Sequence, residues 1–320
     1  MATFFKFKTM KRSEILANFE LPLMTLLARA HKLHAENFDE NAVQCSSLVS
    51  VKTGGCSEDC KYCAQSARYQ KSVGLTREKT MPLAEVLEKA RAAKANGASR
   101  FCMGWAFKSP KASDMAEILP MIKAVKALGL QTCVTLGMVS SDDAKALKEA
   151  GLDYYNHNLD TSPEFYANIV STHSFDERLK TLENLRQAKI KLCAGGIIGM
   201  GESRDARAGL LEALSELEPP PESVPINQLV AISGTPLDCA PPLDSFEFVR
   251  TIACARLAMP KSFVRIAAGR AAMSDELQAL CFFAGANSIF QSEKLLTTSN
   301  AAANSTHTAE LFKRLQLKAV

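Results

Sequence analysis

Short apolar segments alternate along the chain with longer segments in which apolar residues recur at helical spacing. The short segments are typical of buried strands, and the longer ones are typical of amphipathic helices. Gly97, Gly129 and Gly151 each follow a helical segment and mark its end. The predicted strands cover residues 44–51, 100–104, 131–136, 152–160, 190–194, 224–230, 262–267 and 286–290. The predicted helices cover residues 13–37, 80–96, 114–128, 141–150, 174–188, 208–217, 246–259 and 274–283.

About eight strands that alternate with helices favour a parallel sheet closed on itself. The predicted fold class is therefore α/β, a TIM-type (β/α)8 barrel. An open doubly wound sheet is the alternative, but the dinucleotide fingerprint is missing, because Gly199 and Gly201 are followed by Arg204 where a third glycine belongs. We expect a helical lead-in over 1–40, the barrel over 41–296, and a C-terminal segment that closes the barrel over 297–320.

Composition allows this fold and limits the partners. The chain has 320 residues, of which 47% are hydrophobic, and this is enough for one large or two ordinary domains. Its formal net charge is +4 without a block of like charges, so neither nucleic acid nor a membrane surface is predicted as a partner. No apolar run approaches the roughly 18 residues of a membrane span. Residues 1–12 lack an apolar signal core, and we expect a frayed start and a cytoplasmic protein.

Ten cysteines in a chain of this size, without an export signal, indicate reduced thiols and metal ligation. Three of them, Cys56, Cys60 and Cys63, have the spacing C-x-x-x-C-x-x-C directly after the first predicted strand. A four-iron cluster normally takes four cysteines, so three would leave one iron open to an exchangeable molecule. Tyr62 would shield such a cluster. A zinc site wants a fourth Cys or His nearby, a ferredoxin cluster has another spacing, and a disulfide cannot use three.

This spacing, with an aromatic residue before the last cysteine, resembles the signature of the radical S-adenosylmethionine (SAM) enzymes. The resemblance implies a 4Fe-4S cluster on Cys56, Cys60 and Cys63, with SAM bound at the open iron.

A second group of unusual residues lies inside the predicted strands. Cys102, Cys133 and Cys193 each occupy a strand, and Arg265 occupies another. Buried cysteines often act as small hydrophobic residues, and a buried arginine often pairs with an acid. The spacing alone does not show that the four converge.

Four further stretches resemble the biotin synthase family, and the match runs over about 13–300: residues 101–104 (FCMG), 153–160 (DYYNHNLD), 223–227 (SVPIN) and 285–290 (GANSIF). The resemblance implies that Cys102, Cys133, Cys193 and Arg265 bind a 2Fe-2S cluster that donates sulfur. It implies insertion of that sulfur into dethiobiotin to form biotin, through 5'-deoxyadenosyl radicals made from SAM. A flavodoxin-like electron donor and a homodimer are implied as well.

The resemblance also assigns binding roles. Asn158 and Asp160, two apart on a predicted strand, suit the ribose of SAM, and Arg178 suits its carboxylate. Tyr62 and Ile197 complete the SAM set, the latter in the glycine turn 195–202 beside the adenine. Dethiobiotin is assigned to Asn158, Asn227, Thr297 and Thr298. Without the resemblance, Asn158 and Asp160 suit a helix cap, Arg178 a solvated helix charge, and the glycines a plain turn.

Some residues stay outside this scheme. We expect His173 at the surface, in a variable patch, and the loop over 105–107 departs from the family pattern. No ligand role is assigned to Cys45, Cys239, Cys254 or Cys281. The rival functions are a radical SAM enzyme without sulfur insertion, a single-cluster electron carrier and a zinc-dependent barrel.

Overall fold

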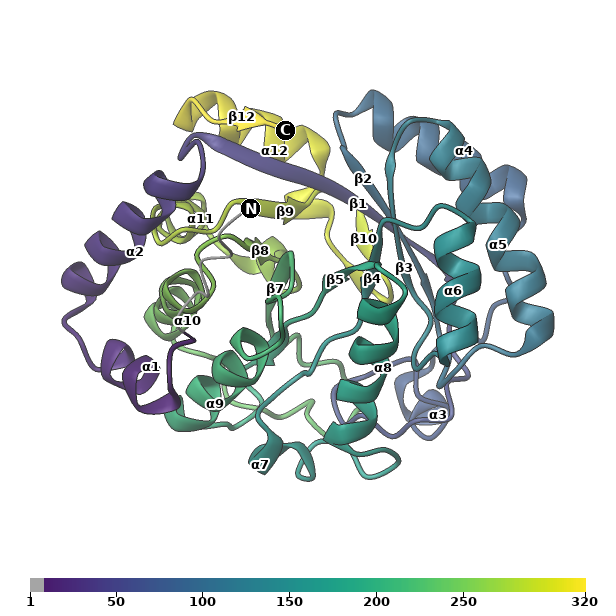
Figure 1. Cartoon of the computed structure of the whole chain (residues 1–320), viewed down its shortest axis with the longest axis horizontal. Helices are drawn as coiled ribbons and strands as arrows, with labels where there is room; N and C mark the ends of the chain where they lie inside the picture. The colour runs from purple at the N-terminus through teal and green to yellow at the C-terminus, as the bar shows by residue number, and fades with distance from the viewer. Residues whose placement is uncertain (1–8) are drawn as a thin grey trace, which may run out of the picture.

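A closed ring of parallel strands forms the centre of the protein in the computed structural model, which describes residues 9–320 (Figure 1). The strand order is β1-β2-β3-β4-β5-β7-β8-β9, and β9 pairs back with β1. The short β6 also pairs with β7, so β5 and β6 are two parts of one barrel position. The TIM-type barrel is confirmed. The strands are β1 (Ala42–Lys52), β2 (Arg100–Trp105), β3 (Gln131–Thr135), β4 (Tyr154–Asn156), β5 (Lys191–Cys193), β6 (Gly196–Ile198), β7 (Ser223–Gln228), β8 (Phe263–Ile266) and β9 (Ser288–Phe290).

Helices follow the strands and surround the barrel, because each has one apolar face to bury against the sheet. The capping box predicted at Ser174 is present, since the Ser174 side chain accepts from Glu177 N and Glu177 bonds back. The larger helices of the ring are α4 (Leu83–Ala95), α5 (Ala112–Ala127), α6 (Ser141–Glu149), α8 (Phe175–Gln187), α9 (Arg204–Ser215), α10 (Ser245–Ala258) and α11 (Asp275–Phe283). Short helices α3 (Gln70–Val73) and α7 (Pro163–Tyr166) lie in loops.

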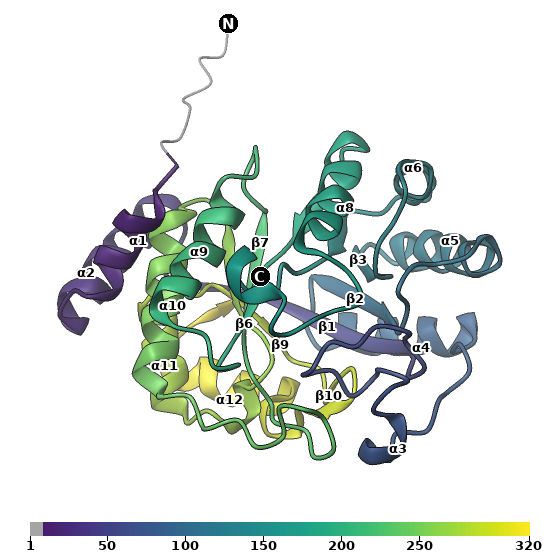
Figure 2. The ribbon, with the colours of Figure 1, turned by 90° about the horizontal axis from the view of Figure 1, so that it is seen from below.

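The predicted lead-in helix is two helices, α1 (Arg12–Phe19) and α2 (Leu23–Asn37). Pro22 separates them, because proline has no N–H to donate and disfavours helical backbone in the residue before it. Outside the ring, α1 packs against α9 and α10, and α2 packs against α10 (Figure 2). Of the predicted frayed start, residues 1–8 lie outside the described part of the chain.

Two predicted boundaries differ from those of the structure by four residues. The strand expected over 152–160 ends at Asn156, so Asn158 and Asp160 do not share a strand face. Asp160 has φ 66°, a left-handed backbone that ends the extended run. Helix α9 begins at Arg204 rather than 208, because Ser203 caps it by accepting from Ala206 N.

After β9 the chain forms a hairpin of β10 (Lys294–Leu295) and β11 (Thr298–Ser299), then α12 (Ser305–Leu315) and β12 (Lys318–Ala319). Strand β12 pairs in parallel with the first residues of β1, Ala42 and Val43. The sheet therefore gains a strand at this point from the far end of the chain. Over residues 9–320 the structure contains no helix with the length and apolar character needed to cross a membrane.

Candidate active site

A cavity of about 320 Å³ opens at the carboxyl ends of the barrel strands. Loops that follow the strands form its mouth, and side chains of the strands form its depth, as expected for this fold. Every candidate site residue predicted from the sequence lines it: Cys56, Cys60, Tyr62, Cys63, Cys102, Cys133, Asn158, Asp160, Arg178, Cys193, Ile197, Asn227, Arg265, Thr297 and Thr298. In contrast, Cys45, Cys254 and Cys281 are buried in the apolar core, and Cys239 is exposed.

The cysteine loop after β1 is fixed by its own backbone. Cys56 N donates to Gln65 O over 3.0 Å, and Ala67 N donates to Cys56 O over 2.7 Å. The loop begins with a turn in which Gly54 and Gly55 have φ of 74° and 78°, values that glycine adopts at least cost. Lys61 N donates to Ile169 O over 3.0 Å, which joins the loop to the segment before α8. The three thiols are therefore presented by a closed turn.

Asp59 strengthens this junction. Its carboxylate accepts from Ser171 N over 2.9 Å and from Thr172 N over 3.2 Å, and it also accepts from both hydroxyls. Burial opposes ionisation of Asp59, but these bonds outweigh it and lower its pKa to about 2. The loop and the segment 171–172 form one unit.

The three loop thiols fit an iron-sulfur cluster by their chemistry. None is in a disulfide, and burial raises the pKa of all three, that of Cys63 to about 11. Buried thiols of raised pKa become thiolates when a bound cation compensates the charge. Over residues 9–320 no three His, Cys, Asp or Glu side chains are grouped as ligands of one metal ion.

The second group of thiols converges deeper in the barrel. Cys102 of β2 lies directly opposite Cys133 of β3, and both side chains are buried. The hydrogen bond between the two thiols, with Arg265 nearby, lowers the pKa of Cys102, while the same hydrogen bond and burial raise the pKa of Cys133. Cys193 of β5 lies 3.9 Å from Arg265 Nη1. The three thiols and the guanidinium thus surround one region, which suits a second iron-sulfur group.

Among residues 9–320, Arg265 is held by neutral partners. Its Nε donates to Ser288 Oγ over 2.8 Å, and its Nη2 donates to Gln44 Oε1 over 3.2 Å and Ser46 Oγ over 3.0 Å. Phe290 lies against its guanidinium, with 4.6 Å from Cζ to the ring centre. These contacts therefore do not form the pair with an acid that the sequence left open for Arg265. Gln44, Ser46 and Ser288 were missed, since polar residues in strands gave no separate signal.

The candidate SAM residues form a second polar group near the mouth. Asp160 Oδ2 accepts from Tyr62 OH over 2.8 Å and from Arg178 Nη2 over 3.0 Å. Asn158 Oδ1 accepts from Gly195 N over 3.2 Å. Helix α7 is capped by Ser162 instead, and the Arg178 side chain is only 14% exposed. These contacts exclude the cap and the solvated charge as the principal roles of these residues.

The backbone around Gly195 leaves no room for a side chain. A Cβ there would lie 1.9 Å from Pro225 O of β7. Gly195 O accepts from the backbone N–H groups of Leu159 and Asp160, and Ile197 N donates to Asp160 O over 2.8 Å. The glycine break between β5 and β6 therefore fixes Asp160 through its backbone.

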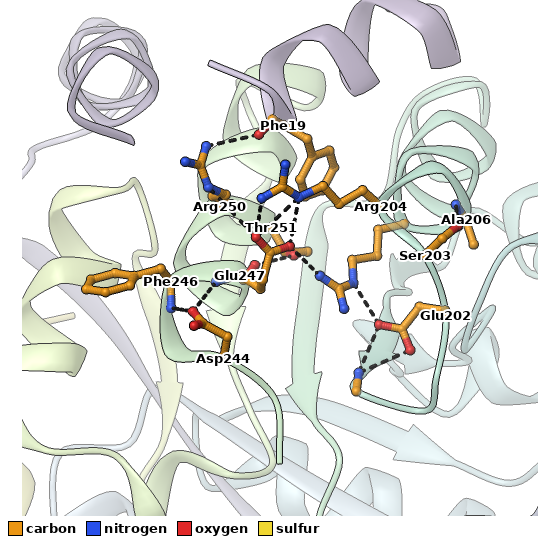
Figure 3. Close-up of polar contacts among 12 residues, drawn as sticks. Phe19, Glu202, Ser203, Arg204, Ala206, Asp244, Phe246, Glu247, Arg250 and Thr251 are labelled. Carbon is orange, nitrogen blue, oxygen red and sulfur yellow. Dashed lines mark hydrogen bonds and ion pairs between the residues drawn. The ribbon is translucent and has the colours of Figure 1, made fainter. Parts of the chain in front are cut away.

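An ion-pair network supports the glycine turn from behind (Figure 3). Glu202 accepts from Gly199 N over 2.9 Å and Met200 N over 2.7 Å, and Arg207 Nε donates to it over 2.7 Å. Arg207 continues to Glu247 of α10, 2.9 Å away. From Glu247 the network reaches the lead-in helices through Arg204, which binds Glu20, and Arg250, which donates to Phe19 O.

The prediction of His173 at the surface is wrong. The residue is 7% exposed, and its Nδ1 is hydrogen-bonded to Glu58 of the cysteine loop. Its Nε2 lies 3.2 Å from Arg178 Nε. Glu58, His173 and Lys108 all line the cavity, although the sequence analysis assigned them no role. The only available signal was the position of Glu58 inside the cysteine motif.

Candidate substrate residues lie on other walls of the cavity. Asn227 Nδ2 donates to Gly196 O over 2.9 Å, and its Oδ1 accepts from Ala268 N over 3.1 Å. Its amide plane is therefore fixed between β6 and the end of β8. Thr297 and Thr298 lie in the hairpin that follows β9, where Thr298 Oγ1 donates to Leu295 O over 3.0 Å.

Comparison with known proteins agrees with this arrangement. Residues 50–214 match the Radical SAM superfamily, and residues 225–318 match the Biotin and Thiamin Synthesis associated domain. A biotin synthase of Aromatoleum aromaticum is 60% identical over 302 residues, which are 94% of this chain and 91% of that protein. The chain belongs to the biotin synthase family. A biotin synthase of Azoarcus sp. is 58% identical over 308 residues, 96% of this chain and 93% of that protein.

Solved structures support the fold of this biotin synthase family member. Methylornithine synthase superposes with a TM-score of 0.83 at 18% identity and covers 98% of this chain and 95% of its own. A maturase of the FeFe-hydrogenase, HydG, gives 0.77 at 17% identity, with 89% and 65% covered. At these identities the likeness concerns the barrel alone. Membership of the radical SAM superfamily makes the chain an enzyme and implies a 4Fe-4S cluster with SAM.

Proposed function

We propose that the chain is a biotin synthase, which inserts sulfur into dethiobiotin by radicals made from SAM. The observation that carries the proposal is that the cysteine loop and the inner thiols line the same cavity. A substrate in this cavity would lie between a radical source at the mouth and a sulfur source in the depth. Acid-base chemistry is a poor alternative, because an unactivated C–H bond offers no proton that a side-chain base can remove.

At the mouth, Cys56, Cys60 and Cys63 would hold the four-iron cluster. When bound, this cluster supplies the electron that splits SAM into methionine and a 5'-deoxyadenosyl radical. The protein orients SAM: Arg178 suits its carboxylate, and Asn158 and Asp160 suit its ribose. Tyr62 fixes Asp160 by its hydrogen bond, and Ile197 gives an apolar contact beside the adenine.

In the depth, Cys102, Cys133, Cys193 and Arg265 would hold the two-iron cluster, which is consumed as the sulfur donor. When bound, that cluster would supply one sulfur atom and would accept one electron for each of the two C–S bonds, after each of two 5'-deoxyadenosyl radicals has taken one hydrogen atom from dethiobiotin. Two SAM molecules are cleaved for one biotin.

Dethiobiotin is assigned to the space between the two sets. Asn227 and Asn158 would bind the ureido ring, because an amide both donates and accepts, and Thr297 and Thr298 would bind the tail carboxylate. Leu295, Leu296 and Ile232 add apolar wall that keeps water from the radicals. We further propose a cytoplasmic homodimer with a flavodoxin-like electron donor.

The test is anaerobic reconstitution with iron and sulfide, followed by SAM, a reductant and dethiobiotin. Biotin and 5'-deoxyadenosine are the expected products. Deoxyadenosine without biotin would leave a radical SAM enzyme that does not insert sulfur. The absence of both products would contradict the proposal as a whole.

A matched pair of variants tests the two ligand sets. Cys133→Ala should lose the two-iron absorption spectrum and biotin formation but retain the four-iron spectrum. Cys254→Ala, which removes a buried thiol of α10 outside the cavity, should retain both spectra. Loss of both clusters in Cys133→Ala would mean that the two ligand sets are not separate.

A further inference from the structure

Two buried side chains, Glu58 and His173, join the cysteine loop to the partly buried Arg178. Glu58, between Cys56 and Cys60, is 6% exposed, and its carboxylate is hydrogen-bonded to His173 Nδ1. The other ring nitrogen of His173 lies 3.2 Å from Arg178 Nε. His173 therefore contacts the loop on one side and the guanidinium on the other.

These contacts define which nitrogen of His173 carries the proton. A guanidinium has N–H donors and no acceptor, so the single Nε–H of Arg178, which is shared with Tyr166 OH, donates and His173 Nε2 accepts. The ring proton then belongs to Nδ1, which donates it to the Glu58 carboxylate. In this tautomer both ring nitrogens are satisfied, and the plane of the imidazole is fixed.

Glu58 and Arg178, on either side of His173, are each fixed by other groups. Glu58 is also bonded to the Thr172 hydroxyl and lies 3.1 Å from Lys108 Nζ. Arg178 Nε also donates to Tyr166 OH over 2.9 Å, and its Nη2 donates to Asp160 over 3.0 Å. Without His173, Arg178 would keep the contacts to Tyr166 and Asp160 but would lose its connection to the cysteine loop.

We propose that His173 is a positioning residue that sets the orientation of Arg178 toward the carboxylate of SAM and couples it to the cysteine loop. The inference rests on the proposed function, in which Arg178 binds that carboxylate. His173 acts through Arg178 and does not itself touch a reacting atom. Because SAM must meet both the open iron and Arg178, a fixed spacing between loop and guanidinium favours its binding.

Two substitutions separate the two halves of the contact. His173→Asn places an amide N–H near the position of Nδ1, so it keeps the bond to Glu58 and removes the acceptor for Arg178. His173→Gln places an amide oxygen near the position of Nε2, so it keeps the acceptor for Arg178. We expect His173→Asn to bind SAM about tenfold more weakly and His173→Gln to recover most of that loss.

The measurement is equilibrium dialysis of reconstituted protein with SAM and, separately, with decarboxylated SAM. The ratio of the two dissociation constants does not depend on the fraction of protein that is folded. In His173→Asn the preference for SAM should shrink, while the affinity for decarboxylated SAM stays within about twofold of wild type. His307→Asn, at the surface on α12, should keep the wild-type ratio.

Equal weakening of both ligands in His173→Asn would overturn the inference, because a general structural role gives that result. An unchanged ratio in His173→Asn would also overturn the inference. If the wild-type protein makes biotin in the same preparation, the proposed function stays intact. If wild-type protein makes no biotin and does not prefer SAM over its decarboxylated analogue, the proposed function and the inference both fail.

Discussion

His34, on α2, is a buried histidine in surroundings that disfavour a charge. It is 1% exposed, and within residues 9–320 neither ring nitrogen has a hydrogen-bond partner. Burial lowers its pKa to about 4, and Arg256 and His31 add to the effect. The imidazole is therefore neutral in the folded protein at neutral pH and serves as a packing group against Phe38.

This residue makes folding stability depend on pH. Because the folded-state pKa of His34 lies below its ordinary value of 6.5, the unfolded chain binds more protons between these two values, and stability falls as the pH falls through that interval. Wild-type protein should lose about 2 kcal/mol more than His34→Leu between about pH 7 and pH 5. Urea unfolding at both pH values measures the difference. Equal losses in the two proteins would contradict the assignment.

Residues of one short motif were predictable from the sequence, and residues that depend on distant partners were not. The spacing of Cys56, Cys60 and Cys63 is local, so it indicates a shared ligand without knowledge of the fold. His173 is buried because of Glu58, which lies 115 positions away, and no local pattern reports that contact. The inner thiols are unusual residues for strands, but the sequence spacing does not show that they converge. The register of β2 and β3 brings Cys102 and Cys133 together.

At the scale of elements, the repeated strand and helix units follow from periodicity alone. The exceptions have local or tertiary causes. Pro22 divides the lead-in, although the helical spacing of apolar residues continues on both sides of it. After β4 ends at Asn156, Gly195 O accepts the N–H groups of both Leu159 and Asp160, and Asp160 has a left-handed backbone. That contact joins two loops and cannot be predicted from the residues of either one.

The network behind the glycine turn makes helices α9 and α10 part of the site. Glu202 and Arg207 have side chains only 1% and 8% exposed, so removal of one charge leaves the other poorly compensated. Glu202→Gln should lower the free energy of unfolding by about 2 kcal/mol. The decrease is smaller than for a buried arginine left without any partner, because Glu247 still pairs with Arg207. Chemical denaturation measures this change.

The matched control is Glu183→Gln on α8, where the pair with Lys180 is mostly exposed, at 55% and 64%. Exposed pairs contribute little, so we expect a change within about 0.5 kcal/mol. If both variants lose the same stability, the burial of the Glu202 pair has no special effect.

At the scale of the whole molecule, the alternation of elements predicts a barrel but does not identify which strands meet. Closure depends on the pairing of β1 with β9, elements from opposite ends of the chain. The further pairing of β12 with β1 had no sequence signal, because Lys318 and Ala319 form a strand of two residues. We propose that the segment 297–320 supports this closure through the pairing of β12 with β1.

Deletion of residues 317–320 tests this proposal. It removes the bonds from Lys318 N to Asn41 O over 2.7 Å, from Val320 N to Val43 O over 3.0 Å and from Cys45 N to Val320 O over 3.1 Å. Three backbone bonds at about 1 kcal/mol each should lower the free energy of unfolding by about 2–3 kcal/mol. SAM affinity should not change. A truncated protein of undiminished stability would show that the segment does not support the barrel.

The anchored cysteine loop has a consequence for the folding of the apoprotein. In small metal-folded domains the ion organises the chain, so apoprotein is unfolded. Here Asp59, Gln65 and Ile169 fix the loop by protein contacts alone, and the apolar core lies elsewhere. Synthesis of the polypeptide and delivery of its iron are therefore separable events. We expect the folded apoprotein to accept iron and sulfide without first unfolding.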